Sequence, residues 1–184
     1  MTTGHVFIAV SLDGFIARAD GGLDWLMKQQ TAGEDHGYDN FMASVDGLIM
    51  GRGSFEKVLS FDDWPYYKPV VVMSRTLNDA DIPRELRGQV QISDLGPVEL
   101  MRELADRGWA RAYIDGGKVI QSFLRAGLVS DVTLTHIPIL IGTGLPLFGG
   151  LDRDIDLDHL ETRSFPSGLV SSTYRIRRTG GRTT

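Results

Sequence analysis

The chain has 184 residues, of which 42% are hydrophobic and 23% charged, and its formal net charge at pH 7 is −5. These values are ordinary for a globular protein, so they exclude a fibrous repeat and a long disordered region. The negative charge argues against nucleic acid or an anionic membrane surface as a partner. The sequence contains no cysteine, which excludes disulfides, thiolate metal sites and cysteine nucleophiles.

The length predicts a single domain over residues 1–178, followed by a flexible tail at residues 179–184. The N-terminus lacks the basic region of a signal peptide, and no apolar segment is long enough to span a membrane. We therefore expect a cytoplasmic protein. The four histidines are scattered at no ligand spacing, so no metal site is expected.

The first quarter of the chain predicts a strand, a loop and a helix. Residues 6–10 are a continuous apolar run with β-branched side chains, which predicts a central strand buried on both faces. Residues 11–22 predict an ordered loop, and residues 23–27 a short helical turn. Apolar side chains at helical spacing predict a helix over residues 34–45, with Asp35 on its inner edge.

The next strand, over residues 47–50, leads directly into a glycine-containing helix start at residues 51–54. Glycines permit close approach of a ligand, and the N–H groups of a helix start attract anions. Arg52 adds a positive charge where an anion would bind. The alternative is an ordinary N-cap by Ser54 with a solvated arginine.

A third buried strand, over residues 69–73, ends in Ser74 and Arg75. Ligands of open α/β sheets lie outside the carboxyl ends of the strands, so both side chains are placed to contact one. Residues 90–92 predict a short strand, and residues 97–107 predict a helix that begins at a proline.

The second glycine junction follows a strand over residues 111–114. Asp115, Gly116 and Gly117 lead from this strand into an amphipathic helix. The two glycines allow a sharp turn and a positive φ, and the helix start points its dipole at an anion. A plain strand-to-helix turn is the alternative for this junction alone, because the full spacing of a known phosphate motif is missing.

The last third of the chain predicts mostly extended structure. Residues 129–141 predict a long strand, residues 142–150 a glycine-rich loop, and residues 157–165 and 169–177 an antiparallel hairpin. The order of elements predicts an α/β fold with three layers, α/β/α. Its central sheet is expected to have about eight mostly parallel strands, with the antiparallel hairpin at the C-terminal end.

Two glycine junctions and a cation beyond a strand end together suit a dinucleotide. The N–H groups of two helix starts can surround one pyrophosphate, and the guanidinium of Arg75 can chelate a 2′-phosphate. The sequence therefore predicts NADPH rather than NADH as the cofactor.

Five motifs in this order resemble the dihydrofolate reductase superfamily, and more closely its branch that includes the reductase domain of bacterial riboflavin biosynthesis, the C-terminal domain of RibD. The motifs are residues 9–17, 49–56, 72–75, 114–119 and 134–137, and the resemblance covers residues 6–177. The loop at residues 142–148 is more similar to the riboflavin branch than to the folate enzymes.

The resemblance implies an oxidoreductase that transfers a hydride from NADPH to a C=N or C=O bond of a pterin-like or ribosylaminopyrimidine substrate, as a 5-amino-6-(5-phosphoribosylamino)uracil reductase does. Ala9 and Ile16 would flank the nicotinamide. The other residues expected at the cofactor are Gly51, Arg52, Gly53, Ser54, Ser74, Arg75, Asp115, Gly116, Gly117, Lys118 and Val119. Asp115 stands where folate enzymes have glycine, so its alternative role is to bond to the loop backbone instead.

The resemblance also implies a catalytic pair. Asp35 falls at the helix position of the folate-enzyme carboxylate, and Thr135 matches the threonine to which that carboxylate is linked. Glu34 and Asp39 are alternatives for the carboxylate, since a small gap in the alignment would select one of them. Asp35 itself has an alternative role as a first-turn helix carboxylate.

Other functions remain open at this stage. The chain could be a non-catalytic NADP(H)-binding module with the same fold, a true dihydrofolate reductase, or another doubly wound protein such as a flavodoxin. The last of these would lack the strand around Thr135 and the closing hairpin. A homodimer is expected by resemblance alone.

Overall fold

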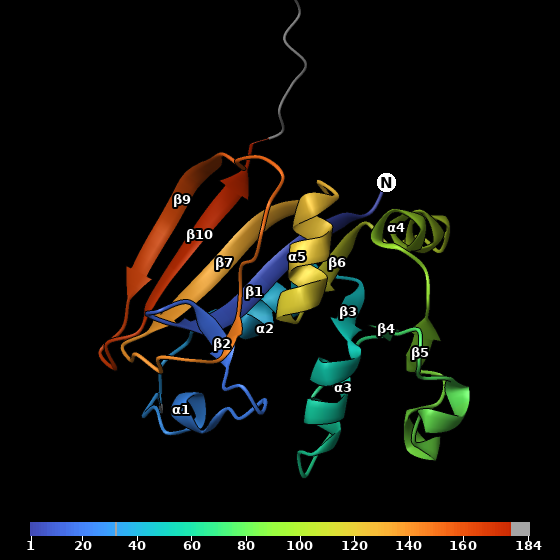
Figure 1. The fold of residues 1–184 in the computed structure, drawn as a ribbon, viewed down its shortest axis with the longest axis horizontal. Helices are drawn as coiled ribbons and strands as arrows, with labels where there is room; N and C mark the ends of the chain where they lie inside the picture. The colour runs from blue at the N-terminus through green and yellow to red at the C-terminus, as the bar shows by residue number, and fades with distance from the viewer. Residues whose placement is uncertain (32, 178–184) are drawn as a thin grey trace, which may run out of the picture.

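The computed structural model describes residues 1–31 and 33–177, so the predicted tail at residues 179–184 lies outside the described residues. Eight strands form one sheet in the order β5-β4-β3-β6-β1-β7-β10-β9 (Figure 1). Their bounds are Thr3–Ser11 for β1, Gly47–Gly51 for β3, Val70–Met73 for β4, Val90–Ser93 for β5, Arg111–Ile114 for β6, Val129–Ile137 for β7, Leu157–Ser164 for β9 and Val170–Ile176 for β10.

The strands from β5 to β7 run parallel, and β10 is antiparallel to both β7 and β9. The predicted sheet and its antiparallel C-terminal hairpin are thus confirmed. The apolar run at residues 6–10 is the centre of β1, which lies between β6 and β7 as predicted; Val6 and Val10 are buried, whereas residues 7–9 are only partly buried.

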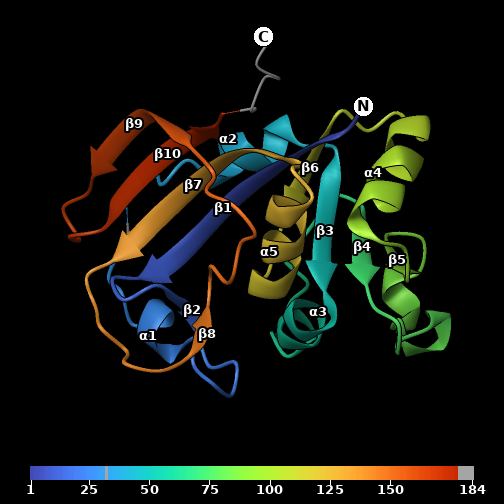
Figure 2. The same ribbon diagram turned by 45° about the horizontal axis from the view of Figure 1, so that its top comes forward.

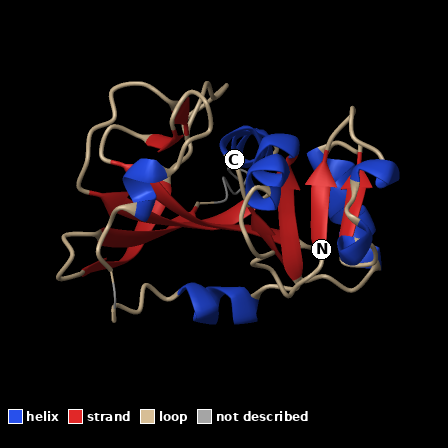
Figure 3. Cartoon of the chain, turned by 90° about the horizontal axis from the view of Figure 1, so that it is seen from below, coloured by secondary structure: helices blue, strands red, loops and turns tan. Residues whose placement is uncertain are grey.

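Helices cover both faces of the sheet (Figure 3). Val6 and Ile114 point to one face, where they pack with α4 (Pro97–Asp106) and α5 (Gly117–Arg125). The alternate residues Phe7 and Tyr113 point to the other face, where they pack with α2 (Tyr38–Ser44) and α3 (Arg52–Leu59). This alternation builds the two cores and confirms the three-layer α/β/α architecture.

A smaller unit lies beyond the carboxyl ends of the strands. It consists of α1 (Asp24–Met27) and a two-stranded sheet of β2 (Phe15–Ala17) and β8 (Leu145–Pro146). Figure 2 shows α1, β2, β8 and α3 gathered beyond the arrowheads of β1, β3 and β7. A third core cluster, with Trp25 and Ile137 fully buried, packs beneath this unit. Two short 3₁₀ helices, η1 (Asp79–Asp81) and η2 (Arg84–Leu86), precede β5.

The helix predicted over residues 34–45 is shorter than expected, because α2 begins only at Tyr38. Asp35 is therefore not on a helix, and that prediction was wrong. Its carboxylate accepts a hydrogen bond from the Gly37 N–H at 2.8 Å, and Gly37 has a φ of 82°, which interrupts a helix. Apolar periodicity carries no signal for such a local turn.

Three other boundaries differ from the sequence prediction. Helix α3 begins at Arg52 after a Gly51 N-cap, so Ser54 lies inside the helix and does not cap it. Strand β7 ends at Ile137, because Pro138 cannot donate a backbone hydrogen bond to continue the ladder. The loops predicted around Phe15 and Leu145 contain β2 and β8, strands too short for a periodicity to show. None of the helices in residues 1–31 and 33–177 has the length and apolar character to cross a membrane.

Candidate active site

The two glycine junctions lie side by side. A Cβ at Gly116 would lie 2.6 Å from Ser54 Oγ, and a Cβ at Gly51 would lie 3.1 Å from Val119 Cγ2. Neither α3 nor α5 has a side-chain cap or an acidic residue in its first turn. Two helix starts with free N–H groups therefore meet at one place, as an anion site requires.

Gly116 has a φ of 87°, a conformation that L residues with a side chain rarely adopt. The sequence therefore needs glycine here both for the backbone angle and for the contact with Ser54. Gly53 is different, since a Cβ there would meet no atom within 4 Å. Its presence in the first turn of α3 leaves the helix start open rather than tightly packed.

Basic and hydroxyl side chains extend the site along the carboxyl ends of β3 and β4. Arg52 Nη1 donates to Thr76 Oγ1 at 3.1 Å, and Ser74 Oγ accepts the backbone N–H of Thr76 at 3.2 Å. Arg75 and Lys118 are exposed, and neither has a hydrogen bond or ion pair among the residues that the structure describes. The positively charged side chains of Arg75 and Lys118 near the glycine junctions are thus available to bind an anion.

The predicted nicotinamide contacts lie on the other side of the same junction. A Cβ at Gly117 would lie 3.1 Å from Ile16 Cδ1 and 2.8 Å from the carbonyl oxygen of Pro146. Ala9 packs with the cluster around Trp25 and Ile137. The structure therefore brings the predicted cofactor residues from β1, β2, α3, β4 and α5 to one edge of the sheet, although whether they bind a cofactor stays a prediction.

Asp115 is an acidic group in the second glycine junction, and it is partly buried. Tyr113 Oη lies 3.3 Å from Asp115 Oδ1 and donates to the carbonyl oxygen of Phe7 at 2.9 Å. Burial raises the pKa of Asp115 above the ordinary carboxyl value, although hydrogen bonds from Ser54, Tyr113 and the Gly116 N–H oppose this. The carboxyl group therefore holds its proton to a higher pH than an exposed aspartate.

Aromatic rings surround this acid. The ring of Phe7 stacks on Phe41 at 5.0 Å and meets Tyr38 edge-on at 5.9 Å, and Phe41 meets Tyr113 at 5.0 Å. Burial, together with the charge of Asp115, raises the pKa of Tyr38 to about 12. Phe7 and Ala9 are on the same face of β1, so this cluster is next to the predicted nicotinamide position.

The same two causes raise the pKa of Tyr66 above its ordinary value. The site is thus lined by tyrosine hydroxyls and by one carboxyl group whose pKa is raised by burial. Sequence reasoning missed this cluster because its members come from β1, α2, β6 and the loop before β4. The alternation of Tyr113 and Asp115 ahead of Gly116 was the one available signal, since it places both on one face.

The predicted catalytic pair is not joined by a hydrogen bond in the described part of the chain. Asp35 is exposed and bonded to Gly37, whereas Thr135 is buried on β7 and donates to Ser171 Oγ at 3.3 Å. The alternative carboxylate, Glu34, accepts the Ser167 N–H at 2.7 Å and its hydroxyl at 2.6 Å. Glu34 thus holds the turn of the C-terminal hairpin, and Asp115 is the acid nearest to the glycine junction.

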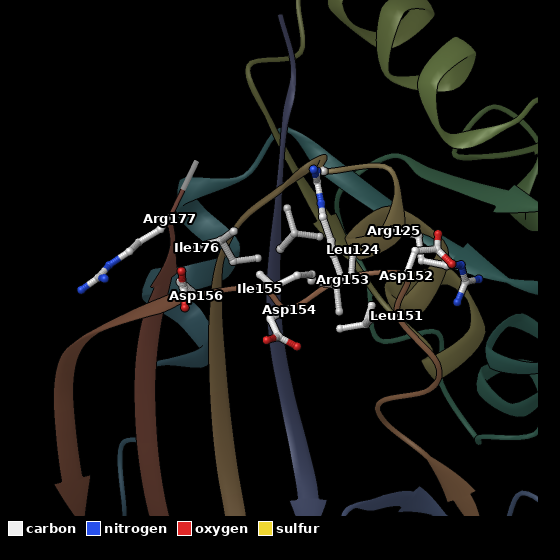
Figure 4. Close-up of a pocket in the computed structure, with 12 residues that line it drawn as sticks. Leu124, Arg125, Leu151, Asp152, Arg153, Asp154, Ile155, Asp156, Ile176 and Arg177 are labelled. Carbon is white, nitrogen blue, oxygen red and sulfur yellow. The ribbon is translucent and has the colours of Figure 1, made fainter. Parts of the chain in front are cut away.

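A cavity of about 440 Å³ lies elsewhere (Figure 4). Its lining includes Arg125 at the end of α5, Val129 at the start of β7, Ile155, and Arg177 after β10. It is therefore at the opposite end of β7 from the glycine junctions, and it contains none of the residues predicted for the cofactor.

The eight-stranded sheet, its antiparallel C-terminal hairpin and the helices on both faces define the class of dihydrofolate reductase-like folds. The dihydrofolate reductase from Enterococcus faecalis, solved in complex with NADP(H), matches with a TM-score of 0.65 at 14% identity, over 96% of this chain and 97% of that chain. At this identity the match shows the fold. A closer class follows from the family comparison.

The RibD C-terminal domain family model matches residues 3–171, and the chain belongs to this family. The uncharacterized protein YwjB of Bacillus subtilis is 30% identical over 87% of this chain and 90% of its own length. A crystal structure from Shewanella sp. PV-4, named for riboflavin biosynthesis, matches with a TM-score of 0.90 at 39% identity, over 96% of this chain and 100% of that chain. The resemblance stated from the five motifs is thus confirmed.

Proposed function

We propose that the protein is an NADPH-dependent reductase that transfers a hydride to a C=N or C=O bond of a pterin-like or ribosylaminopyrimidine substrate. The observation that carries the proposal is the contact between the two uncapped helix starts at Gly51 and Gly116, with the exposed Arg75 after β4, the strand next to β3. A pyrophosphate needs N–H donors and a 2′-phosphate needs a guanidinium, so the residues present fit this cofactor.

Relatives support the reaction class. The riboflavin biosynthesis protein RibD of Mycobacterium tuberculosis is 28% identical over 73% of this chain, which spans 41% of that protein. A Thermotoga maritima structure of a deaminase and 5-amino-6-(5-phosphoribosylamino)uracil reductase shares the fold, with a TM-score of 0.74. This chain covers 57% of that bifunctional protein. Whether it acts on the same substrate is therefore part of the proposal.

Different residues of the chain would bind different parts of the cofactor and the substrate. The N–H groups of α3 and α5 would bind the pyrophosphate, Ser74 and Arg75 the 2′-phosphate, and Ala9 and Ile16 the nicotinamide, which supplies the hydride when bound. The aromatic rings of Phe7 and Tyr38 would stack on a planar substrate and exclude water.

Asp115 is our candidate for the proton donor, in place of Asp35. Burial raises its pKa, so the carboxyl group beside Tyr113 takes up a proton more readily than an exposed aspartate and would pass it to the ring nitrogen or carbonyl oxygen of a bound heterocycle. Asp35, which is exposed and bonded to Gly37, has no comparable environment.

The proposal is tested by fluorescence titration with NADPH and NADH, using wild-type protein, Arg75→Ala and Arg102→Ala. Arg102 is an exposed arginine on α4 and serves as the control. We expect micromolar NADPH binding that weakens by about 1.5–3 kcal/mol in Arg75→Ala, the value of a charge-assisted contact, with NADH unaffected. Binding of neither nucleotide by the wild type would overturn the proposal.

A second function, a non-catalytic NADP(H)-binding module, is favoured by one observation, which is the absence of a hydrogen bond between Asp35 and Thr135 in the described residues. NADPH oxidation with dihydrofolate and with aminopyrimidines separates the two functions. Turnover of any of these substrates would exclude the module, and preference for dihydrofolate would identify a folate enzyme.

A further inference from the structure

Four tyrosines gather beside the carboxyl group of Asp115. We call them the tyrosine cluster, and they are Tyr38, Tyr66, Tyr67 and Tyr113. Tyr113 is buried, with its hydroxyl 3.3 Å from Asp115 Oδ1, whereas Tyr38 is 39% exposed and Tyr67 is 68% exposed. The cluster therefore reaches from the second glycine junction to the surface. It is placed to contact the substituent that a bound heterocycle carries toward solvent.

The charges around the tyrosine cluster are negative. Burial raises the pKa of Tyr38, and the charges of Asp115 and Asp39 raise it further. Burial and the charge of Asp115 also raise the pKa of Tyr66 and of Tyr113. A cation close to these hydroxyls would lower their pKa values, and no basic side chain in residues 1–31 and 33–177 is a cause of such a shift. A phosphate placed here would therefore meet two carboxyl groups and no compensating charge.

Basic side chains next to the aromatic rings of this face already have partners. Lys68 Nζ donates to the Val45 carbonyl oxygen at 2.8 Å and lies 5.8 Å from the centroid of the Tyr67 ring. The guanidinium carbon of Arg163 lies 5.4 Å from the centroid of the Phe165 ring. Both cations are thus held against aromatic or backbone groups rather than directed at a ligand.

The available cations lie on the cofactor side of the site. Arg75 follows β4 and Lys118 is in the first turn of α5, where the phosphates of the proposed cofactor would bind. In the smaller unit of α1, β2 and β8, Arg18 donates to both carboxylate oxygens of Asp24, at 2.6 and 2.8 Å. Lys28, exposed at the end of α1, is the basic side chain of that unit without a bond to any described residue. It is therefore the alternative contact for a substrate phosphate.

We propose that the tyrosine cluster selects a heterocycle whose substituent carries no phosphate, such as a free ribose. The inference rests on the proposed function, because it names the substrate class of the same site. Tyrosine rings offer apolar faces to the CH groups of a sugar, and their hydroxyls exchange hydrogen bonds with its hydroxyls. A phosphate dianion would instead lose hydration beside Asp39 and Asp115. The substrate class is thus an unphosphorylated pterin or ribosylaminopyrimidine.

The test measures kcat/KM at saturating NADPH for 5-amino-6-(5-phosphoribosylamino)uracil and for the same compound without its phosphate. We expect the wild type to prefer the unphosphorylated compound about tenfold or more, and high salt to reduce this preference by screening. This comparison needs no variant. Calorimetric titration of both compounds into the NADPH-bound protein gives the same ratio from binding alone.

A charge reversal at Asp39 tests which group causes the preference. In Asp39→Lys, an ammonium beside Tyr38 should shift the ratio of the two kcat/KM values about tenfold toward the phosphorylated compound. A ratio cancels any general loss of activity in the variant. Asp106→Lys is the matched control, since Asp106 is exposed at the end of α4 on the opposite face of the sheet, and it should leave the ratio within about twofold.

The outcomes separate the two proposals. If the wild type binds NADPH but prefers the phosphorylated compound or binds neither, the selection is overturned and the reductase proposal stands. Loss of that opposite preference in Lys28→Ala or Lys68→Ala would identify the lysine that binds the phosphate. A preference that neither salt nor Asp39→Lys alters would show exclusion by shape and would overturn the role of the acidic groups. If the wild type binds no NADPH, the proposed function falls, and this inference falls with it.

Discussion

Asp115, the proton donor that we propose, is expected to cost stability. Its carboxyl group is partly buried beside Tyr113 and Ser54, and burial raises its pKa in the folded state. A group with a raised folded pKa stabilises the protein below its ordinary pKa, and this contribution is lost as pH rises through the raised value. The folded protein therefore tolerates an ionised Asp115 at neutral pH at some cost.

We predict that Asp115→Asn abolishes most of the reductase activity but raises the melting temperature at pH 8. An asparagine oxygen still accepts from Ser54 and Tyr113 without the desolvation penalty of a charge. The difference in melting temperature between variant and wild type should shrink toward pH 4. Calorimetry at both pH values checks this, and a variant that is less stable than wild type at pH 8 would contradict it.

Gly116 is a second position where one residue determines the local structure of the candidate site. We predict that Gly116→Ala lowers the free energy of unfolding by about 1–3 kcal/mol, because its φ is 87° and the new Cβ would meet Ser54 Oγ at 2.6 Å. Gly53→Ala is the control. It introduces a Cβ with open space around it and should stabilise α3 by about 0.5–1 kcal/mol. Urea denaturation measures both, and equal effects would refute the prediction.

At the scale of elements, the C-terminal hairpin is tied to the segment before α2 by Glu34. Its carboxylate accepts two bonds from Ser167, between β9 and β10, and His36 from the same segment packs on Phe165 at 4.3 Å. These contacts fix the hairpin turn against the segment before α2. The Glu34 side chain is only 11% exposed, and a hydrogen bond to a charged, largely buried group contributes more to stability than an exposed one.

We predict that Glu34→Gln lowers the free energy of unfolding by about 1–2 kcal/mol, since its amide group must face one of the two donors. Asp35→Asn is the matched control, because an asparagine oxygen can keep the bond to Gly37. The same control tests the catalytic role predicted for Asp35 from the resemblance. An Asp35→Asn protein with full stability and no hydride transfer would support that role over Asp115.

At the scale of the whole molecule, the sheet has an open edge. Strand β9 ends the sheet, and every residue of it except Asp158 is exposed. Glu161 and Arg163 are two positions apart and so lie on one face. If a second copy pairs antiparallel with Thr162 on the two-fold axis, each Glu161 lies opposite an Arg163 of the other copy. We propose this self-complementary edge as the dimer contact.

We predict that Glu161→Arg weakens self-association about tenfold or more, since it places arginines opposite each other. The double exchange of Glu161→Arg with Arg163→Glu restores the opposite charges and should restore the dimer. Sedimentation velocity over a range of concentrations measures this. A wild type that is monomeric throughout would refute the predicted homodimer.

The single domain at residues 1–178 and the cytoplasmic location also stay predictions.

Local signals in the sequence were sufficient for the class of fold and for much of the candidate site. Buried strands such as residues 69–73 are continuous apolar runs, and the glycines before α3 and α5 mark helix starts, because each feature depends on neighbours in the chain. For the same reason, the apolar run at residues 69–73 was sufficient to predict that Arg75 lies beyond the end of a strand. The residues of each such feature are neighbours in the sequence, so their capacity to bind an anion can be predicted without knowledge of the fold.

Only the tertiary structure decided which distant residues meet. The register of β1 against β6 and β7 places Phe7 beside Tyr113 and Asp115, and the Asp13 carboxylate reaches Gly142. The Gly37 turn likewise removes Asp35 from the helix. Strand register and loop closure are set by packing across the whole sheet, which no single stretch of the chain encodes. For that reason the sequence by itself determined the fold class and the glycine junctions, whereas only the structure decided which acidic and aromatic side chains lie beside those junctions.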